Sequence, residues 1–376
     1  MIECLIKNGR VVCAGTIQTI DIGIRDGRIA CLGIDLPIAP GTAVIDASGL
    51  VVLPGLVDVH VHLRDPGFTH KEDFASGTRA AAASGITTVV AQPNTNPAIT
   101  TPAAFATVRE IGEHNAFVDF GISAAATEDN FGQLEALVRL GALSIDFALG
   151  GSAPALTVRS NATLLAILEA VARLGTLATV YTGDAEIGAA ARQRLQAAGR
   201  KDPMAYADAF PAETELMGAS RLLAAAIATR ARIHIRQVSC PQTVELAQRM
   251  KPLLRPTQLT IEVTPHHLYL DRSAIETQGV HAIMGPPLRT PAEAAALRAA
   301  LRCGAIDIVC TDHAPHLFDE KLSGEDDVWK CPPGTPGLET LLPSLLTAVH
   351  RGEMTLPELA RVACEQPARI FGLYHR

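Results

Sequence analysis

The sequence predicts a closed (β/α)8 barrel that is preceded by a small β-rich domain. From Leu53 onward, short apolar and often β-branched runs alternate with Ala- and Leu-rich segments of helical length, and eight such runs can be traced. Alternation of strands with helices is typical of a parallel sheet, and eight repeats of this unit close a barrel. An open doubly wound sheet is the alternative, but no glycine-rich phosphate-binding loop follows the first strand.

Residues 1–52 are expected to form the small sheet. Strand-like runs occupy Glu3–Val12, Thr16–Ile24 and Ala43–Val52, and the Asp26-Gly27 pair favours a hairpin turn. A sheet of this size is marginal by itself, so we expect it to pack on the barrel. The predicted organisation is a β domain over 1–52, a barrel over 53–364, and a shortened C-terminal segment over 365–376 that packs back.

The barrel elements follow in order. Strands are expected at Val57–His62, Thr87–Gln92, Phe117–Ile122, Ala142–Phe147, Leu177–Tyr181, Ile233–Val238, Leu259–Val263 and Ile306–Thr311. Helices are expected at Phe74–Ser84, Pro102–His114, Phe131–Leu140, Ala162–Leu174, Glu213–Arg230, Pro241–Lys251 and Pro291–Arg302. The long insertion Gly183–Ala212 after the fifth strand is predicted to cover the site as a lid.

Composition excludes several classes of function. The 376 residues carry a formal net charge of −7 without a basic cluster, which argues against binding to nucleic acid. The start of the chain lacks the apolar run of a signal peptide, and no stretch has the length of a membrane span. The eight cysteines include no CxxC pair and are expected to be reduced thiols. We therefore expect a cytoplasmic protein.

Polar side chains follow nearly every apolar strand at its C-terminal end. Catalytic groups of (β/α)8 barrels stand at these ends. His60 and His62 lie two residues apart on the first strand, so both imidazoles can face one cation. Two histidines without a ligand role are the alternative interpretation of this pair. Asp312, after the eighth strand, is expected beside them and could bind a divalent ion and accept a proton.

The chain resembles the cyclic amidohydrolases, namely dihydroorotase, hydantoinase and allantoinase. The matching stretches lie in the right order over most of the chain: Pro54–Gly67 (PGLVDVHVHLRDPG), Lys71-Glu72-Asp73, Gly85–Pro97 (GITTVVAQPNTNP), Pro286–Arg289 (PPLR), Thr311–His316 (TDHAPH), Gly334–Thr340 (GTPGLET) and Pro367–Leu373 (PARIFGL). Arg64 directly after the HxHL segment is similar to dihydroorotase rather than to allantoinase.

Four positions depart from the pattern of this family. Asp146 matches the carboxylated lysine that bridges two metals in relatives, although some dihydroorotases carry Asp there. Tyr181 and Gln237 match the histidines that end strands five and six. Gly285 matches the usual asparagine before Pro-Pro-Leu-Arg. His234 is not expected to replace either histidine, because strand parity sends it to the opposite face from Gln237.

The resemblance implies that these substitutions remove one of two metals. In relatives, the lysine and the two histidines hold the second metal. The remaining set is His60, His62, Asp312 and, as an oxygen donor in place of the bridge, Asp146. Two imidazoles and two carboxylates suffice for one Zn²⁺ with a position left for water. We therefore expect one zinc ion per chain.

The resemblance also implies a site for a carboxylated substrate. By motif match, Arg64, Asn94 and His316 are the residues that hold the substrate carboxylate in dihydroorotases. An arginine can bind a carboxylate through two parallel, charge-assisted hydrogen bonds. The alternative is that Arg64 merely pairs with Asp65 or Asp73.

Two functions from different classes follow. The first is a hydrolase that opens a small carboxylated cyclic amide such as dihydroorotate, with Asp312 as the base; a hydrolase for another ring is a variant of it. The second is a non-catalytic dihydroorotase homologue that acts as a binding or scaffolding subunit, for instance beside aspartate carbamoyltransferase. The resemblance further implies a homo-oligomer.

Overall fold

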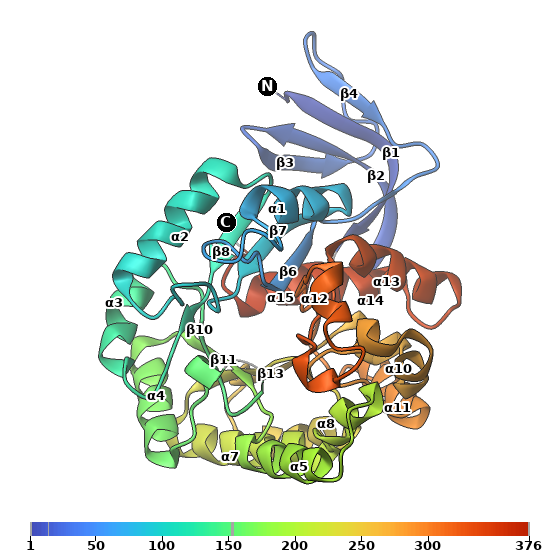
Figure 1. The fold of residues 1–376 in the computed structure, drawn as a ribbon. Coiled ribbons are helices and arrows are strands. Elements are labelled where there is room, and N and C mark those ends of the chain that lie inside the picture. The colour runs from blue at the N-terminus through green and yellow to red at the C-terminus, as the bar shows by residue number, and fades with distance from the viewer. Residues whose placement is uncertain (1, 14, 152–153, 375–376) are drawn as a thin grey trace.

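A ring of parallel strands surrounded by helices carries a separate β-sheet on one side (Figure 1). The computed structural model describes residues 2–13, 15–151 and 154–374. Within these ranges, no helix combines the length and apolar character that crossing a membrane requires.

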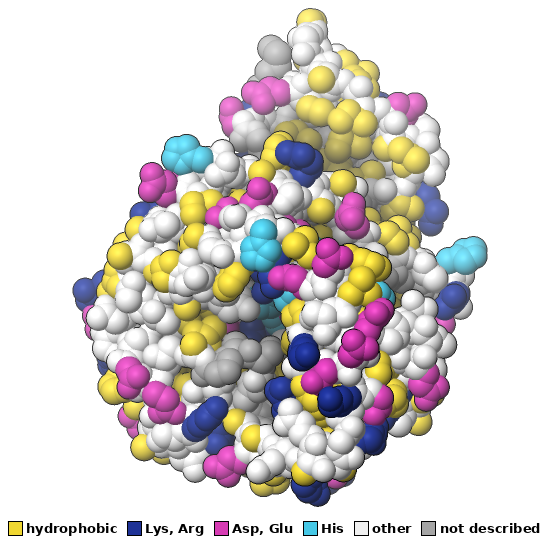
Figure 2. All heavy atoms as spheres, in the orientation of Figure 1, with side chains coloured by type: hydrophobic (Ala, Val, Ile, Leu, Met, Phe, Trp, Pro, Cys, Tyr) yellow, Lys and Arg dark blue, Asp and Glu magenta, His cyan; other side chains and the backbone are white. Residues whose placement is uncertain are grey.

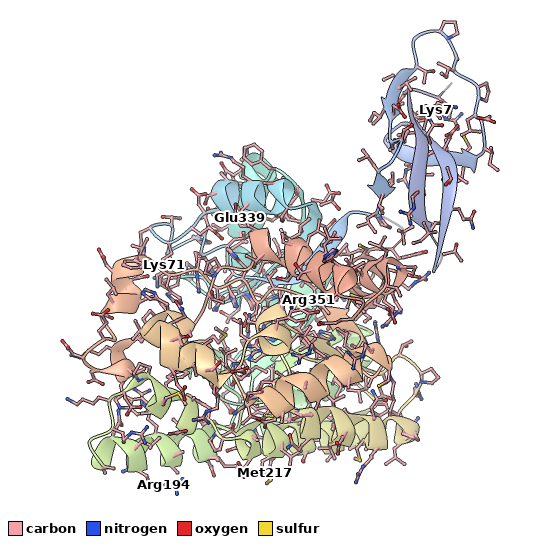
Figure 3. All side chains as sticks on the ribbon, turned by 90° about the vertical axis from the view of Figure 1, so that its right-hand side faces the viewer. Lys7, Lys71, Arg194, Met217, Glu339 and Arg351 are labelled. Carbon is pink, nitrogen blue, oxygen red and sulfur yellow. The ribbon has the colours of Figure 1, made fainter. Side chains whose placement is uncertain are left out.

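The N-terminal sheet contains five strands: β1 (Cys4–Cys13), β2 (Thr16–Arg25), β3 (Arg28–Gly33), β4 (Ala43–Asp46) and β5 (Val51–Val52). Its order is β3-β2-β1-β4, and β5 also pairs with β1. Asp26 and Gly27 form the predicted hairpin turn with φ values of 53° and 67°. Positive φ at both central residues suits the right-handed twist of the flanking strands. Figure 3 shows this sheet, with Lys7, standing beside the barrel.

The sheet has a buried ion pair of its own. Asp21 is 2.8 Å from Lys7 Nζ and accepts hydrogen bonds from the backbone N–H groups of Asn8 (3.0 Å) and Leu36 (2.9 Å). The Lys7 hydrogen bond, followed by that of Asn8, lowers the pKa of Asp21. These contacts connect β1, β2 and the segment after β3.

Asp21→Ala is expected to destabilise this sheet by about 1–3 kcal/mol, because a lysine and two backbone donors lose their acceptor. Hydrogen exchange of peptides from β1 and β2, followed by mass spectrometry, should become faster. Glu113→Ala, which removes an exposed helix pair at 3.8 Å from Arg109, is the matched control and should leave exchange unchanged. Equal exchange in wild type and Asp21→Ala would contradict this account.

The barrel strands are β6 (Leu56–Val61), β7 (Ile86–Ala91), β8 (Asp119–Ile122), β9 (Ala124–Ala125), β10 (Ile145–Ala148), β11 (Leu177–Tyr181), β12 (Arg232–Ile235), β13 (Leu259–Val263) and β14 (Ile308–Val309). They form two parallel runs, β6-β7-β8 and β9 to β14. A parallel bridge between Val61 and His313 joins the last segment to the first, and β8 continues almost directly into β9. The predicted closed barrel is therefore confirmed, and Asp312 lies beside the end of β6.

The helices are α1 (Phe74–Ala83), α2 (Pro102–Asn115), α3 (Leu134–Arg139), α4 (Asn161–Leu174), α5 (Ala185–Ala197), α6 (Pro203–Asp208), α7 (Ala212–Thr229), α8 (Pro241–Met250), α9 (Pro265–Tyr269), α10 (Arg272–Gln278), α11 (Pro291–Arg302), α12 (Phe318–Leu322), α13 (Leu341–His350), α14 (Leu356–Ala360) and α15 (Gln366–Ile370). Helix α4 illustrates why they form. Ser160 caps its start and Gly175 ends it with a φ of 67°. Its buried residues, Leu164, Ile167, Leu168 and Val171, recur at helical spacing and face the core.

Two segments outside the regular repeat bear on the site. The insertion predicted as a lid contains α5 and α6 and brings Tyr206 and Phe210 to the wall of a cavity at the strand ends. The C-terminal α15 packs back on the barrel, where Ile370 and Phe371 join a cluster with Val57 and Val59 of β6. Movement of the lid and the domain limits at residues 52 and 364 stay predictions.

Candidate metal and substrate site

A cavity of about 280 Å³ opens at the C-terminal ends of the barrel strands. Figure 2 shows the hollow in this face of the molecule, with histidine and basic side chains inside it. Every site residue that the sequence singles out lines this cavity: His60, His62, Arg64, Asn94, Asp146, Tyr181, Gln237, Gly285, Asp312 and His316. The fold thus brings together residues that lie up to 256 positions apart, from His60 to His316.

His60 is oriented by a carboxylate behind it. Its Nδ1 lies 2.6 Å from Glu262 Oε1, and the other oxygen of Glu262 lies 2.9 Å from His234 Nε2. A carboxylate can only accept, so Nδ1 of His60 carries the proton, and Nε2, which faces the cavity, is the nitrogen left to bind a cation. This arrangement is typical of histidines that bind metals.

His62 is oriented in the same way by an amide. Its Nδ1 lies 2.6 Å from the Oδ1 atom of Asn94, so Nδ1–H donates and Nε2 again presents a lone pair. Burial, the largest cause, lowers the pKa of His62 to about 4. The ring is therefore neutral at pH 7.

Asp312 completes a group of three acceptors. Its Oδ1 is 3.1 Å from His60 Nε2 and 3.2 Å from His62 Nε2. Burial works against ionisation of Asp312, but the neighbouring imidazoles of His60 and His62 outweigh it and hold the pKa below its ordinary value. Lone pairs and a negative charge that converge in this way favour a cation between them.

The spacing of these three atoms fits a zinc ion. All three ligand atoms lie within 4.8 Å of one another. A tetrahedral zinc ion with bonds of ~2.0–2.1 Å separates its ligand atoms by ~3.3 Å, close to the two measured separations. A second group, His60, Glu262 and Cys310, fits less well. Burial raises the pKa of the Cys310 thiol, and Glu262 already accepts from two histidines.

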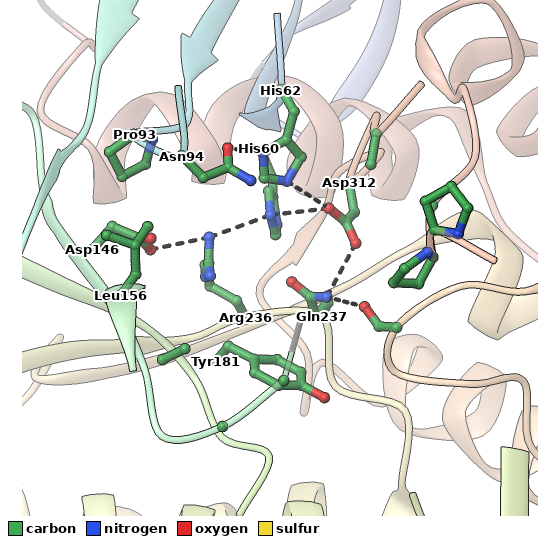
Figure 4. Close-up of a pocket in the computed structure, with 18 of the residues that line it drawn as sticks. His60, His62, Pro93, Asn94, Asp146, Leu156, Tyr181, Arg236, Gln237 and Asp312 are labelled. Carbon is green, nitrogen blue, oxygen red and sulfur yellow. Dashed lines mark hydrogen bonds and ion pairs between the residues drawn. The ribbon is translucent and has the colours of Figure 1, made fainter. Parts of the chain in front are cut away.

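Asp146, the predicted fourth ligand, lines the cavity but is bound by another side chain. Its Oδ1 lies 3.0 Å from Arg236 Nη1 and accepts from the hydroxyl of Thr179 at 3.0 Å. Burial raises the pKa of Asp146, and the guanidinium of Arg236 counteracts that rise. In Figure 4, Arg236 lies between Asp146 and His60. The structure therefore brings His60, His62 and Asp312 together and leaves Asp146 outside that group.

The other altered positions form the wall of the cavity opposite the histidines. Gln237 Nε2 donates to Asp312 Oδ2 at 3.1 Å and to the Gly285 carbonyl at 2.6 Å. A hydrogen-bond donor thus stands at the position where the family resemblance predicts a histidine, and it fixes the second oxygen of Asp312. Burial raises the pKa of Tyr181, so its hydroxyl stays protonated.

The three residues predicted to hold a carboxylate all line the cavity. Arg64 donates to the Pro315 carbonyl at 3.3 Å, and its Nη2 lies 3.4 Å from His316 Nε2, which itself donates to the Pro333 carbonyl at 3.1 Å. Among the residues that the structure describes, no carboxylate is in ion-pair distance of Arg64, so the predicted alternative of a pair with Asp65 or Asp73 does not form. Burial, then Arg64, lowers the pKa of His316 to about 4.

Sequence reasoning missed Arg236, Glu262 and the partners of His313. Glu262 and Arg236 are charged residues within predicted strands that are otherwise mostly apolar. A charged side chain in such a strand indicates a possible role in the site. His313 Nε2 lies 2.7 Å from Glu72, and its Nδ1 accepts from the Gly337 N–H at 3.0 Å. This histidine thereby connects three of the segments that carry the resemblance.

Comparison with known proteins agrees with this geometry. A model of the amidohydrolase family matches residues 51–376. The dihydroorotase of Methanosarcina mazei is 35% identical over 373 residues, which cover 98% of this chain and 80% of the relative. Among solved structures, the L-hydantoinase (dihydropyrimidinase) of Arthrobacter aurescens has a TM-score of 0.96 and 31% identity over 100% of this chain and 83% of its own. The dihydropyrimidinase of Brevibacillus agri NCHU1002 has a TM-score of 0.91 and 28% identity, over 98% and 82%.

Proposed function

This chain belongs to the amidohydrolase family, among the cyclic amidohydrolases, and from this premise we propose that it opens the ring of a small cyclic amide that bears a carboxylate. One observation carries the proposal. A group of three metal-ligand atoms and an arginine without a carboxylate partner among the described residues line the same cavity. The volume of about 280 Å³ suits one small ring rather than a polymer.

His60, His62 and Asp312 are the proposed ligands of one zinc ion. Zinc in this position would lower the pKa of water and polarise an amide carbonyl. Glu262 and Asn94 keep the two imidazoles in the tautomer that binds a cation, since each accepts the Nδ1 proton. Asp146 would have to leave Arg236 to join them, so we propose three protein ligands instead of the expected four.

Asp312 is the proposed base. Its lowered pKa keeps the carboxylate ionised at neutral pH, and it can accept a proton from water and return it to the leaving ring nitrogen. Gln237 holds Oδ2 at 3.1 Å, so the carboxylate is fixed while the proton moves.

Arg64, Asn94 and His316 are the proposed carboxylate-binding residues. The amide oxygen of Asn94 is used by His62, so its Nδ2 group is the donor that remains for a ligand. His316 is neutral at pH 7, and Lys71, whose Nζ lies 3.1 Å from His316 Nδ1, is paired with Glu320 at 3.1 Å, so Arg64 supplies the positive charge for a ligand carboxylate. Because the Methanosarcina relative is named a dihydroorotase, dihydroorotate is the first compound to test.

Arg64→Met tests the orientation of the substrate. It is expected to lower kcat/KM for dihydroorotate about 100-fold, because a charge-assisted pair is lost, and to change little for a hydantoin without a carboxylate. Ring opening followed by ultraviolet absorbance measures both. Arg79→Met, on the exposed side of α1, is the control. An equal loss on both rings would contradict the assignment of Arg64.

A further inference from the structure

A buried guanidinium lies at the centre of the site. The Arg236 side chain is 9% exposed and follows β12. Its Nη1 atom lies 2.8 Å from Gln92 Oε1, 3.0 Å from Asp146 Oδ1 and 3.3 Å from His60 Nε2. One nitrogen is therefore surrounded by a carboxylate, an amide oxygen and an imidazole, which are groups that also surround metal ions.

We infer that Arg236 is a fixed internal cation that stands in the place of a second metal ion and limits the site to one. This inference rests on the proposed function, because it takes His60, His62 and Asp312 as the ligands of the first ion. Arginine keeps its proton inside proteins, so its charge cannot be removed by pH.

The position of Arg236 explains the limit. Two metal ions in one site lie ~3.5–4 Å apart. An ion next to His60 Nε2 on the side of Asp146 would collide with Nη1 and be repelled by its charge. The negative charge of Asp146 is balanced by the positive charge of Arg236 in their ion pair, and the neighbouring Tyr181 and Gln237 are uncharged. The part of the site around Arg236 and Asp146 therefore has neither room nor net negative charge for a second cation.

Arg236 also lowers the affinity of the site for the ion it does bind. A positive charge and a neutralised carboxylate beside His60 both weaken the attraction for a divalent cation. A residue that merely supports the site would act in the opposite direction, since its loss would disorder His60 and weaken binding. The sign of the change separates the two roles.

A cycle of variants tests the inference by metal affinity, with Zn²⁺ titrated against a chromophoric chelator and metal content measured by mass spectrometry. Wild type should bind one ion per chain. Arg236→Met should bind Zn²⁺ at least about tenfold more tightly, because Asp146 becomes a free carboxylate. Arg236→Lys keeps the charge and should stay near wild type. Weaker binding by Arg236→Met, or no change, would overturn the inference.

The double variant Arg236→Met with Asp146→Asn separates charge from ligation. If Asp146 acts as the charge partner of Arg236, the double variant should return to within about threefold of wild type. If Asp146 were a ligand, the double variant would bind as weakly as Asp146→Asn alone, and the inference would be wrong. Should Arg236→Met fail to fold, Arg236→Gln, which keeps hydrogen-bond donors without the charge, replaces it in the cycle with the same expected gain in affinity. Wild type without any bound Zn²⁺ would refute the proposed function itself, whereas one ion in wild type with the wrong sign in Arg236→Met refutes only this inference.

Discussion

Asp312→Ala is expected to abolish ring opening, with a fall in kcat/KM of at least ~10³. Proton transfer by a positioned side chain contributes ~10²–10⁴, and Asp312 is also one of the three proposed metal ligands. Its Oδ1 is the atom that both imidazoles face, at 3.1 and 3.2 Å, so two neutral lone pairs remain when it is removed. Zinc content should fall together with the activity.

Asp326→Ala is the matched control, because Asp326 is exposed in the loop after α12. Its rate and zinc content should equal those of wild type. Asp312→Asn adds information, since the amide keeps the size of the side chain and a weak oxygen ligand but cannot act as the base. If Asp312→Asn or Asp312→Ala retains the wild-type rate, the role given to this residue is wrong.

Removal of zinc with a chelator is expected to remove all ring-opening activity, and one equivalent of Zn²⁺ per chain should restore it. The thermal unfolding temperature should fall at the same time, because an ion that binds only the folded state stabilises it. Both effects follow from three acceptor atoms that converge within 4.8 Å.

Activity of the stripped protein would contradict a metal-dependent mechanism. Absence of bound zinc together with absence of activity towards dihydroorotate, hydantoins and allantoin would instead favour the second hypothesis, a non-catalytic homologue. In that outcome, binding of the intact cavity to dihydroorotate and association with aspartate carbamoyltransferase become the properties to measure.

The sequence by itself determined the barrel and most of the polar residues at the C-terminal ends of its strands. Alternation of apolar runs with helical segments is a local property, and each strand carries its polar residue at its own end. The HxH spacing of His60 and His62 needs only the two-residue period of a strand. For these reasons the strands, many of the cavity-lining residues and the family could be predicted from the chain alone.

Only the tertiary structure decided which of these side chains contact one another. Strand parity predicted that His234 and Gln237 point to opposite faces. It did not predict that Arg236 lines the cavity beside Gln237; the φ of 40° at Gln237 breaks the alternation there. Arg236 then reaches Asp146, which comes from a strand 90 positions earlier. Such a contact depends on which strands are neighbours around the barrel and on one local backbone twist. Most residues of the site could therefore be predicted from the sequence, whereas the role of Arg236 and the pairing of the charges were set by the closed fold.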